Sequence, residues 1–77
     1  MNNEQMMLNL CRNISYLRKK HNLSKSKMAK ILGISVKSLN LIESGVIPSR
    51  LNCDVLYRLY FHFNISIKKM FEDNIDM

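Results

Sequence analysis

Two short helical segments lie so close together in this sequence that only a sharp turn can connect them. Apolar residues recur at three- and four-residue steps over residues 25–32 and again over 36–44, a spacing that predicts two helices. Ser24 and Ser35 precede these segments as N-caps, because a serine hydroxyl can accept an unpaired backbone N–H at a helix start. Gly33 ends the first helix, since it adopts backbone angles that are costly for residues with a Cβ. The pair is therefore predicted to form a helix-turn-helix.

The residues around the turn also meet the packing demands of such a pair, which spans about residues 25–44. Ala29 is small, as is needed where the second helix crosses close to the first. The positions that must hold both helices against a shared core are all apolar, namely Met28, Leu32, Ile34, Leu39 and Ile42. A lone small residue followed by a glycine would be weak evidence, but the full set of matched positions favours the helix pair.

Three further helices are predicted, over residues 4–21, 51–63 and 67–71. Asn22 and Asn64 follow the first two of them, and asparagine tolerates the left-handed conformation that ends helices. Their core-facing stripes are Met7, Leu10, Ile14 and Leu17 in the first, and Leu56, Leu59, Tyr60 and Phe63 in the second. With 2 glycines and 1 proline in 77 residues, a turn-dense β-sandwich or barrel is disfavoured. The sequence thus predicts a single all-α domain of five helices over the whole chain.

The basic residues are unevenly distributed along the chain. There are 12 Lys and Arg residues against 6 Asp and Glu, for a net charge of +6. Residues 1–50 hold nine basic and two acidic residues, a net +7, whereas residues 51–77 hold three basic and four acidic residues, a net −1. This asymmetry favours a polyanion partner on one side of the molecule, although a solvated basic surface explains the charge equally well.

Several function classes lack the residues that they need. No pair of carboxylates falls on one helical face in the basic region, and no Cys–His pair or glycine-rich phosphate loop occurs, so neither enzyme activity nor a cofactor is expected. Cys11 and Cys53 form no metal-ligand or disulfide pattern and are predicted to be buried free thiols, as in a reducing cytosol. No apolar run approaches the roughly 20 residues that span a membrane, and no signal peptide is visible. A soluble, cytoplasmic protein without a metal site is expected.

A set of short motifs extends the pattern of the helix pair over nearly the whole chain. They are Leu17-Arg18-Lys19-Lys20, Leu23-Ser24, Met28-Ala29, Leu32-Gly33-Ile34-Ser35, Ile42-Glu43-Ser44-Gly45, Pro48-Ser49 and Asn64-Ile65-Ser66. With these motifs the chain resembles the XRE, or phage-repressor-like, helix-turn-helix family, the five-helix, lambda-repressor-like regulators of bacteria and their mobile elements. The resemblance implies a sequence-specific regulator that binds double-stranded DNA, acts as a repressor and is nucleoid-associated when bound. In that family the second helix of the pair, here residues 36–44, enters the major groove.

The resemblance also implies roles for individual positions. The base-contacting positions are Val36, Lys37 and Leu41, with Ser38 and Asn40 close by. The phosphate-contacting positions are Ser24, Lys25, Lys27, Ser44 and Arg50. Arg18 and Glu43 correspond to a charge pair that ties the first helix to the end of the third, although the two side chains could equally be solvated apart. Ala29 and Gly33 keep the structural roles given above.

One departure from the family concerns the positions that read bases. Members often carry Gln, Arg or Ser there, whereas Val36 and Leu41 are apolar. Apolar side chains can pack on thymine methyl groups and so contribute to specificity. Alternatively, this surface no longer reads bases and another protein is the partner. On the first interpretation Lys37 is the candidate to donate a hydrogen bond to guanine, unless it is an ordinary solvated lysine.

The C-terminal third adds apolar residues outside the predicted stripe. Tyr57 and Phe61 are four residues apart on one helical face. They are followed by Met70, Phe71 and Ile75. Because exposed apolar clusters commonly mark association surfaces, residues 51–77 are expected to form a homodimer on a pseudo-palindromic site. Burial of the cluster under the C-terminal tail is the alternative. A protein-interaction module, such as an antitoxin or anti-regulator, stays open as an alternative function.

Overall fold

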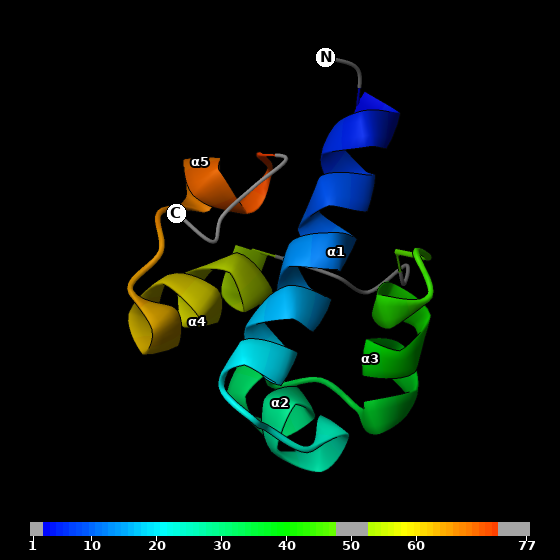
Figure 1. Cartoon of the computed structure of the whole chain (residues 1–77), viewed down its shortest axis with the longest axis vertical. Coiled ribbons are helices and arrows are strands. Elements are labelled where there is room, and N and C mark those ends of the chain that lie inside the picture. Colours follow the sequence, from blue (N-terminus) through cyan, green and yellow to red (C-terminus); the bar gives the residue numbers. More distant parts are fainter. Residues whose placement is uncertain (1–2, 48–52, 73–77) are drawn as a thin grey trace.

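The computed structural model describes residues 3–47 and 53–72, and within these ranges it contains helices and no strand. In chain order the helices are α1 (Asn3–Lys20), α2 (Lys25–Leu32), α3 (Val36–Glu43), α4 (Cys53–Phe63) and α5 (Ile67–Met70). Figure 1 shows α1 as the central helix, with α2 across one end, α3 along one side, and α4 and α5 on the opposite side. The predicted all-α, five-helix fold is confirmed.

Local sequence sets the helix ends. Within the described residues, every helix end lies within one residue of its predicted position, and the predicted start of the fourth helix at residue 51 lies outside them. Asn22 and Asn64 both have φ of 55°, the left-handed conformation that ends α1 and α4. The hydroxyls of Ser24 and Ser35 accept hydrogen bonds from the backbone N–H groups three residues later, at 3.1 and 3.0 Å.

One hydrophobic core lies between the helices. Its buried members are Leu10, Cys11, Ile14, Leu17, Met28, Ala29, Leu32, Leu39, Ile42, Val55, Leu59 and Met70. The predicted stripes are wrong at Met7 and Tyr60, which are exposed. Met7 belongs to the first turns of α1, which project beyond the neighbouring helices (Figure 1). In α4 the buried residues are Val55 and Leu59, so Tyr60 falls on the outward face. Cys53 is exposed on the same face, seven residues earlier, and the prediction that both thiols are buried is correct for Cys11 alone.

Two buried asparagines fasten α5 to α1. The amide of Asn13 donates to the carbonyl oxygens of Met70, at 2.7 Å, and Glu72, at 2.9 Å. The amide of Asn9 donates to the carbonyl of Phe71 at 3.0 Å. These bonds satisfy the carbonyl groups at the end of α5 and bring Met70 into the core. The expectation that Met70 and Phe71 are exposed is therefore wrong, because Met70 is buried and Phe71 is half-buried. Ile75 lies outside the described residues.

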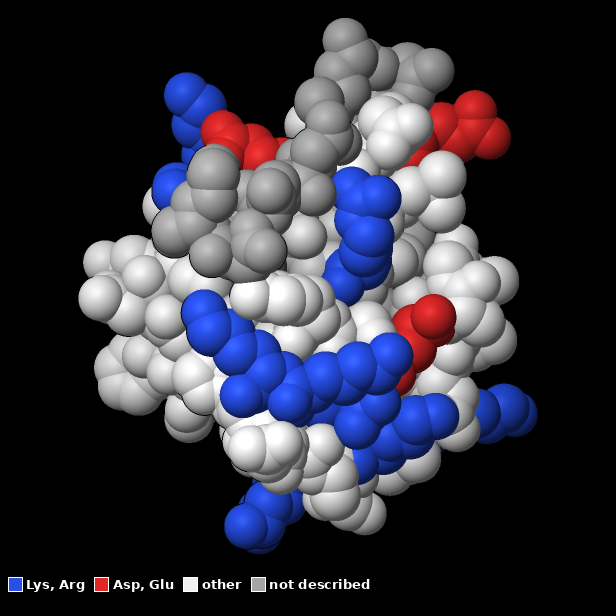
Figure 2. Space-filling view, in the orientation of Figure 1, with Lys and Arg blue, Asp and Glu red and all other residues white. Residues whose placement is uncertain are grey.

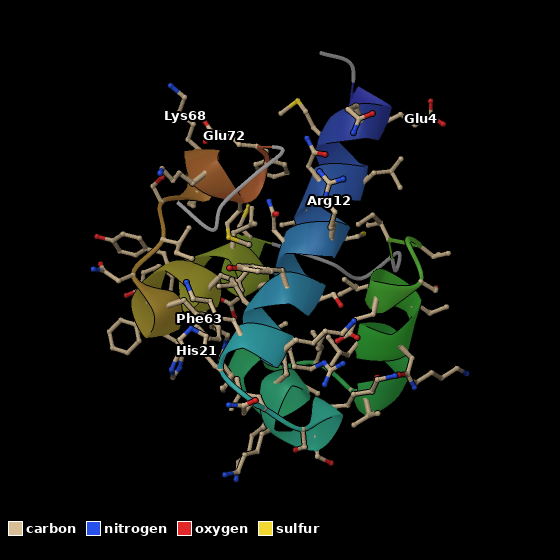
Figure 3. The ribbon with its side chains drawn as sticks, in the orientation of Figure 1. Glu4, Arg12, His21, Phe63, Lys68 and Glu72 are labelled. Atoms are coloured by element: carbon tan, nitrogen blue, oxygen red, sulfur yellow. The ribbon has the colours of Figure 1, made fainter. Side chains whose placement is uncertain are left out.

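The far ends of α1 and α4 also meet. The rings of His21 and Phe63 lie with their centroids 5.0 Å apart, and Figure 3 shows the two side chains together where these helices end. Asn22 and Asn64, which follow these two helices, turn the chain away from this contact. Helix α5 packs against α1 through the asparagine bonds, α4 packs against α2 and α5, and α3 packs against α1 and α2.

Candidate nucleic-acid interface

The turn between α2 and α3 is fixed by backbone geometry at Gly33. This residue has φ of +73°, and the N–H of the next residue, Ile34, donates to the carbonyl of Ala29 at 3.0 Å. Ala29 is buried where the two helices pack. A Cβ built on Gly33 would lie 3.1 Å from the guanidinium carbon of Arg58, which reaches over the turn from α4. Gly33 therefore suits the turn by its backbone angles, and a side chain there would also press on the end of Arg58.

Helix α3 divides cleanly into a buried and an exposed face. Leu39 and Ile42 point into the core. Val36 and Leu41 are 39% and 38% exposed despite their apolar side chains, and Lys37 is exposed beside them. Apolar residues kept at the surface of a short helix have no role in the core, so they are available to a partner.

An ion pair locks the end of α3 to α1. Arg18 Nε donates to Glu43 Oε2 at 2.6 Å and Arg18 Nη2 donates to Glu43 Oε1 at 3.1 Å, which is the two-pronged geometry that suits a guanidinium and a carboxylate. Arg18 Nη1 also donates to the carbonyl of Leu23 at 3.1 Å. The hydrogen bond from Arg18 to Glu43 raises the pKa of the guanidinium above its usual value. Both side chains are mostly buried, so the pair that the resemblance implied is present as a structural tie between helices.

A second polar contact joins the start of α2 to the middle of α3. Lys25 Nζ donates to Asn40 Oδ1 at 2.8 Å, and both side chains are exposed. The bond uses the carbonyl oxygen of the exposed amide and does not use its two N–H donors. The contact therefore places the charged ammonium group of Lys25 next to the amide of Asn40.

The remaining predicted site residues fall into three groups. The hydroxyl of Ser38 accepts from that of Ser35 at 3.1 Å, and the hydroxyl of Ser44 donates to the carbonyl of Leu41 at 2.7 Å, so both hydroxyls are held by the helix itself. Lys27 points toward α4 rather than α3. Arg50 lies outside the described residues.

The sequence of this helix pair and its flanks matches a known family model. The model, described as helix-turn-helix, covers residues 14–59, more than half of the chain. The chain belongs to the XRE-type helix-turn-helix family. It is thus a DNA-binding helix-turn-helix regulator. Neither the curated proteins nor the solved structures contain a significant match to it.

The charge on this helix-turn-helix domain suits a DNA partner. No Asp or Glu occurs from residue 5 to residue 42, and the carboxylate of Glu43 is bound by Arg18. Figure 2 shows Lys and Arg side chains gathered over the end of the molecule that holds the helix pair. The acidic side chains on that face lie mainly at the other end, around Glu4 and Glu72 (Figures 2 and 3). A phosphate backbone approaching the helix pair therefore meets cations with little opposing negative charge.

Other kinds of site are not found in the described part of the helix-turn-helix domain. It holds no cluster of three or more His, Cys, Asp or Glu side chains that could bind a metal ion. None of its described helices has the length and apolar character needed to cross a membrane.

Two elements of the interface were not predicted from the sequence. The bond between Lys25 and Asn40 joins side chains that are fifteen residues apart on different helices, and the contact of Arg58 with Gly33 joins α4 to the turn that follows α2. No local spacing links either pair, so only the packing of the helices brings them together.

Proposed function

We propose that this helix-turn-helix domain binds a specific DNA operator with α3 in the major groove and represses transcription there. The observation that carries the proposal is the exposed face of α3. It presents Val36, Lys37 and Leu41 on a helix that the Arg18–Glu43 ion pair holds in place. Residues 5–43 contain no acidic residue other than Glu43. A helix held in place in this way suits base reading, because little ordering is needed on binding.

The proposed base-contacting residues would recognise different groups on the bases. Val36 and Leu41 would contact the C5-methyl groups of thymine, while Lys37 would donate to O6 or N7 of guanine. The amide of Asn40, held by Lys25, keeps donors for a base or a phosphate oxygen.

The remaining predicted contacts go to the phosphate backbone. The backbone N–H groups at the start of α2, beside Ser24 and Lys25, suit a phosphate, since a helix N-terminus attracts anions. Ser44, which follows α3, and Arg50, which the resemblance assigns to the same role, complete the proposed phosphate contacts. A bound protein at a promoter excludes polymerase by occupancy, which is the basis for proposing repression.

We also propose a homodimer formed through the outward face of α4. Tyr57 and Phe61 are 58% and 69% exposed there, with their rings stacked at a centroid distance of 6.2 Å, and Tyr60 lies on the same face. A pseudo-palindromic operator requires two copies of α3 about 34 Å apart, and we propose that a two-fold interface on this face provides the second copy. Sedimentation of the free protein and of its DNA complex tests this directly. A monomer under both conditions would exclude the dimer.

The test of operator binding is a fluorescence anisotropy titration with the DNA upstream of the gene, against scrambled competitor. The expected result is binding that survives competitor and weakens steeply with salt, because each phosphate contact releases counterions. Binding that competitor abolishes would show that α3 does not read sequence, and the proposed function would fail.

A further inference from the structure

A cationic groove lies between α2 and α4, on the side of α2 that does not face α3. It has a volume of about 310 Å³ and is lined by Lys27, Lys30, Ile31, Arg58 and His62. Lys27 and Lys30 come from α2 and Arg58 from α4, so positive charge stands on both walls. Ile31 is half-buried and supplies an apolar surface between them.

The charge of this groove is not balanced by its neighbours. Among the described residues, the carboxylate that approaches a lining cation is that of Asp54, whose Oδ2 lies 4.0 Å from Arg58 Nε and which is itself exposed. An ion pair this long and this exposed is weak. Three lining cations therefore face the single carboxylate of Asp54, and the groove keeps an excess of positive charge.

The position of the groove separates it from the proposed DNA surface. Helices α3 and α4 lie on opposite sides of α1 (Figure 1). Lys25 reaches toward α3 and bonds Asn40, whereas Lys27, two residues later on α2, lines the groove with α4. One wall of the groove therefore belongs to α4, on the other side of α1 from α3, so its occupant can differ from the duplex.

The lining identifies the chemistry of that occupant. Carboxylates complement the lysines and the forked guanidinium of Arg58, and an apolar side chain complements Ile31. A phosphate backbone would use the cations but would gain nothing from the apolar wall. A second copy that placed its own lysine-bearing α2 in the groove would bring like charges together, and the homodimer proposed above uses the face of α4 with Tyr57, Tyr60 and Phe61 instead. We propose that the α2–α4 groove binds an acidic segment of a partner protein, in which carboxylates flank an apolar residue.

The experiment uses the full chain and a labelled peptide rich in Glu and Leu. An otherwise identical peptide with Gln in place of every Glu is the neutral control. We expect saturable binding of the acidic peptide, weaker at higher salt, with amide shifts in NMR spectra confined to α2 and α4. The variant Lys30→Gln with Arg58→Gln should bind about tenfold more weakly, since two charge pairs are lost.

The matched control is Lys68→Gln with Lys69→Gln, which removes the same charge from α5, at the other end of the molecule from α2 (Figure 3). This variant should bind the peptide as the parent does. Lys30→Gln alone should weaken binding severalfold. Because Lys30 is exposed and Arg58 is kept, this variant shows whether the loss of binding occurs without a folding defect.

Three results would overturn the proposal. They are equal binding of the acidic and neutral peptides, equal losses in the groove and α5 variants, and no saturable binding. Loss of DNA affinity in the groove variants, without peptide binding, would instead assign the groove to phosphate. Because the peptide is titrated without DNA, the outcome is independent of whether the proposed operator exists.

Discussion

At the scale of single residues, Gly33 carries two requirements at one position. Its φ of +73° is costly for residues with a Cβ, and the guanidinium of Arg58 occupies the space beside it. Asn22 and Asn64 adopt similar angles elsewhere in the chain, so this fold tolerates asparagine where the backbone is left-handed.

Comparing two substitutions of Gly33 therefore separates the effect of backbone strain from the effect of losing glycine. Gly33→Val should lower the free energy of unfolding by about 1–3 kcal/mol, because a β-branched residue is strained at positive φ. Gly33→Asn should cost less, since asparagine visits this region more readily. Urea denaturation followed by circular dichroism measures both. Unchanged stability in the valine variant would contradict the assigned turn.

The two thiols should differ sharply in reactivity. Cys11 is buried, and its burial raises the pKa of the thiol, so little reactive thiolate forms there near neutral pH. Cys53 is exposed at the start of α4. A colorimetric thiol reagent should modify one thiol per chain quickly, and Cys53→Ser should remove that fast phase. A fast phase that survives in Cys53→Ser would mean that Cys11 is accessible.

At the scale of helices, the sequence was sufficient where the determinants are local. The serine caps, the turn at Gly33 and the asparagine helix ends each depend on a few adjacent residues, and all are present. Periodicity predicted an apolar face on α4, but the buried face is centred on Val55 and Leu59 and excludes Tyr60. Which residues are buried depends on the helices that pack against α4. Asn13 could not be anticipated as a buried residue, since its partners lie 57 and 59 positions away.

The same limit applies to the candidate interface. Its residues on α3 follow from the family pattern, whereas the bond from Lys25 to Asn40 and the groove beside Arg58 need the helices in place. Contacts between side chains of different helices leave no signal in local spacing.

Removing the amide of Asn13 tests how α5 is held. Asn13→Ala leaves the carbonyls of Met70 and Glu72 without this donor, at a cost of about 1–3 kcal/mol. Hydrogen exchange should rise over residues 66–72 before it rises in α2 or α3. Ser66→Ala, which removes only a surface cap, should have a smaller effect on stability. Uniform acceleration throughout the chain would contradict a local fastening role.

The tie between α1 and α3 is measured by a double-mutant cycle. Arg18→Met, Glu43→Gln and the double variant should give a coupling energy of about 1–3 kcal/mol, because the pair is two-pronged and mostly buried. The exposed pair Asp54 and Arg58, at 4.0 Å, is the matched control and should couple by less than about 1 kcal/mol. Similar coupling in both cycles would mean that the Arg18 pair does not fix α3.

At the scale of the whole molecule, helix packing separates two surfaces with different chemistry. Helix α1 stands between α3, which carries the proposed reading residues, and α4, which forms the cationic groove with α2 (Figure 1). Helix α2 carries three lysines and no acid, and the one acid of α3, Glu43, is bound by Arg18. If both proposals hold, DNA and an acidic protein segment would bind to different helices of one domain.

The central claim is that exposed residues of α3 read bases, and Lys37 tests it most directly. The measurement is the affinity of the parent and of Lys37→Ala for a selected operator and for its single-base-pair variants, at constant salt. Lys68→Ala on α5 is the control for lost charge. The account predicts that Lys37→Ala loses about 1–3 kcal/mol of discrimination at one base pair and keeps it elsewhere. Uniform weakening across all sequences would assign Lys37 to phosphate and contradict the proposed reading role.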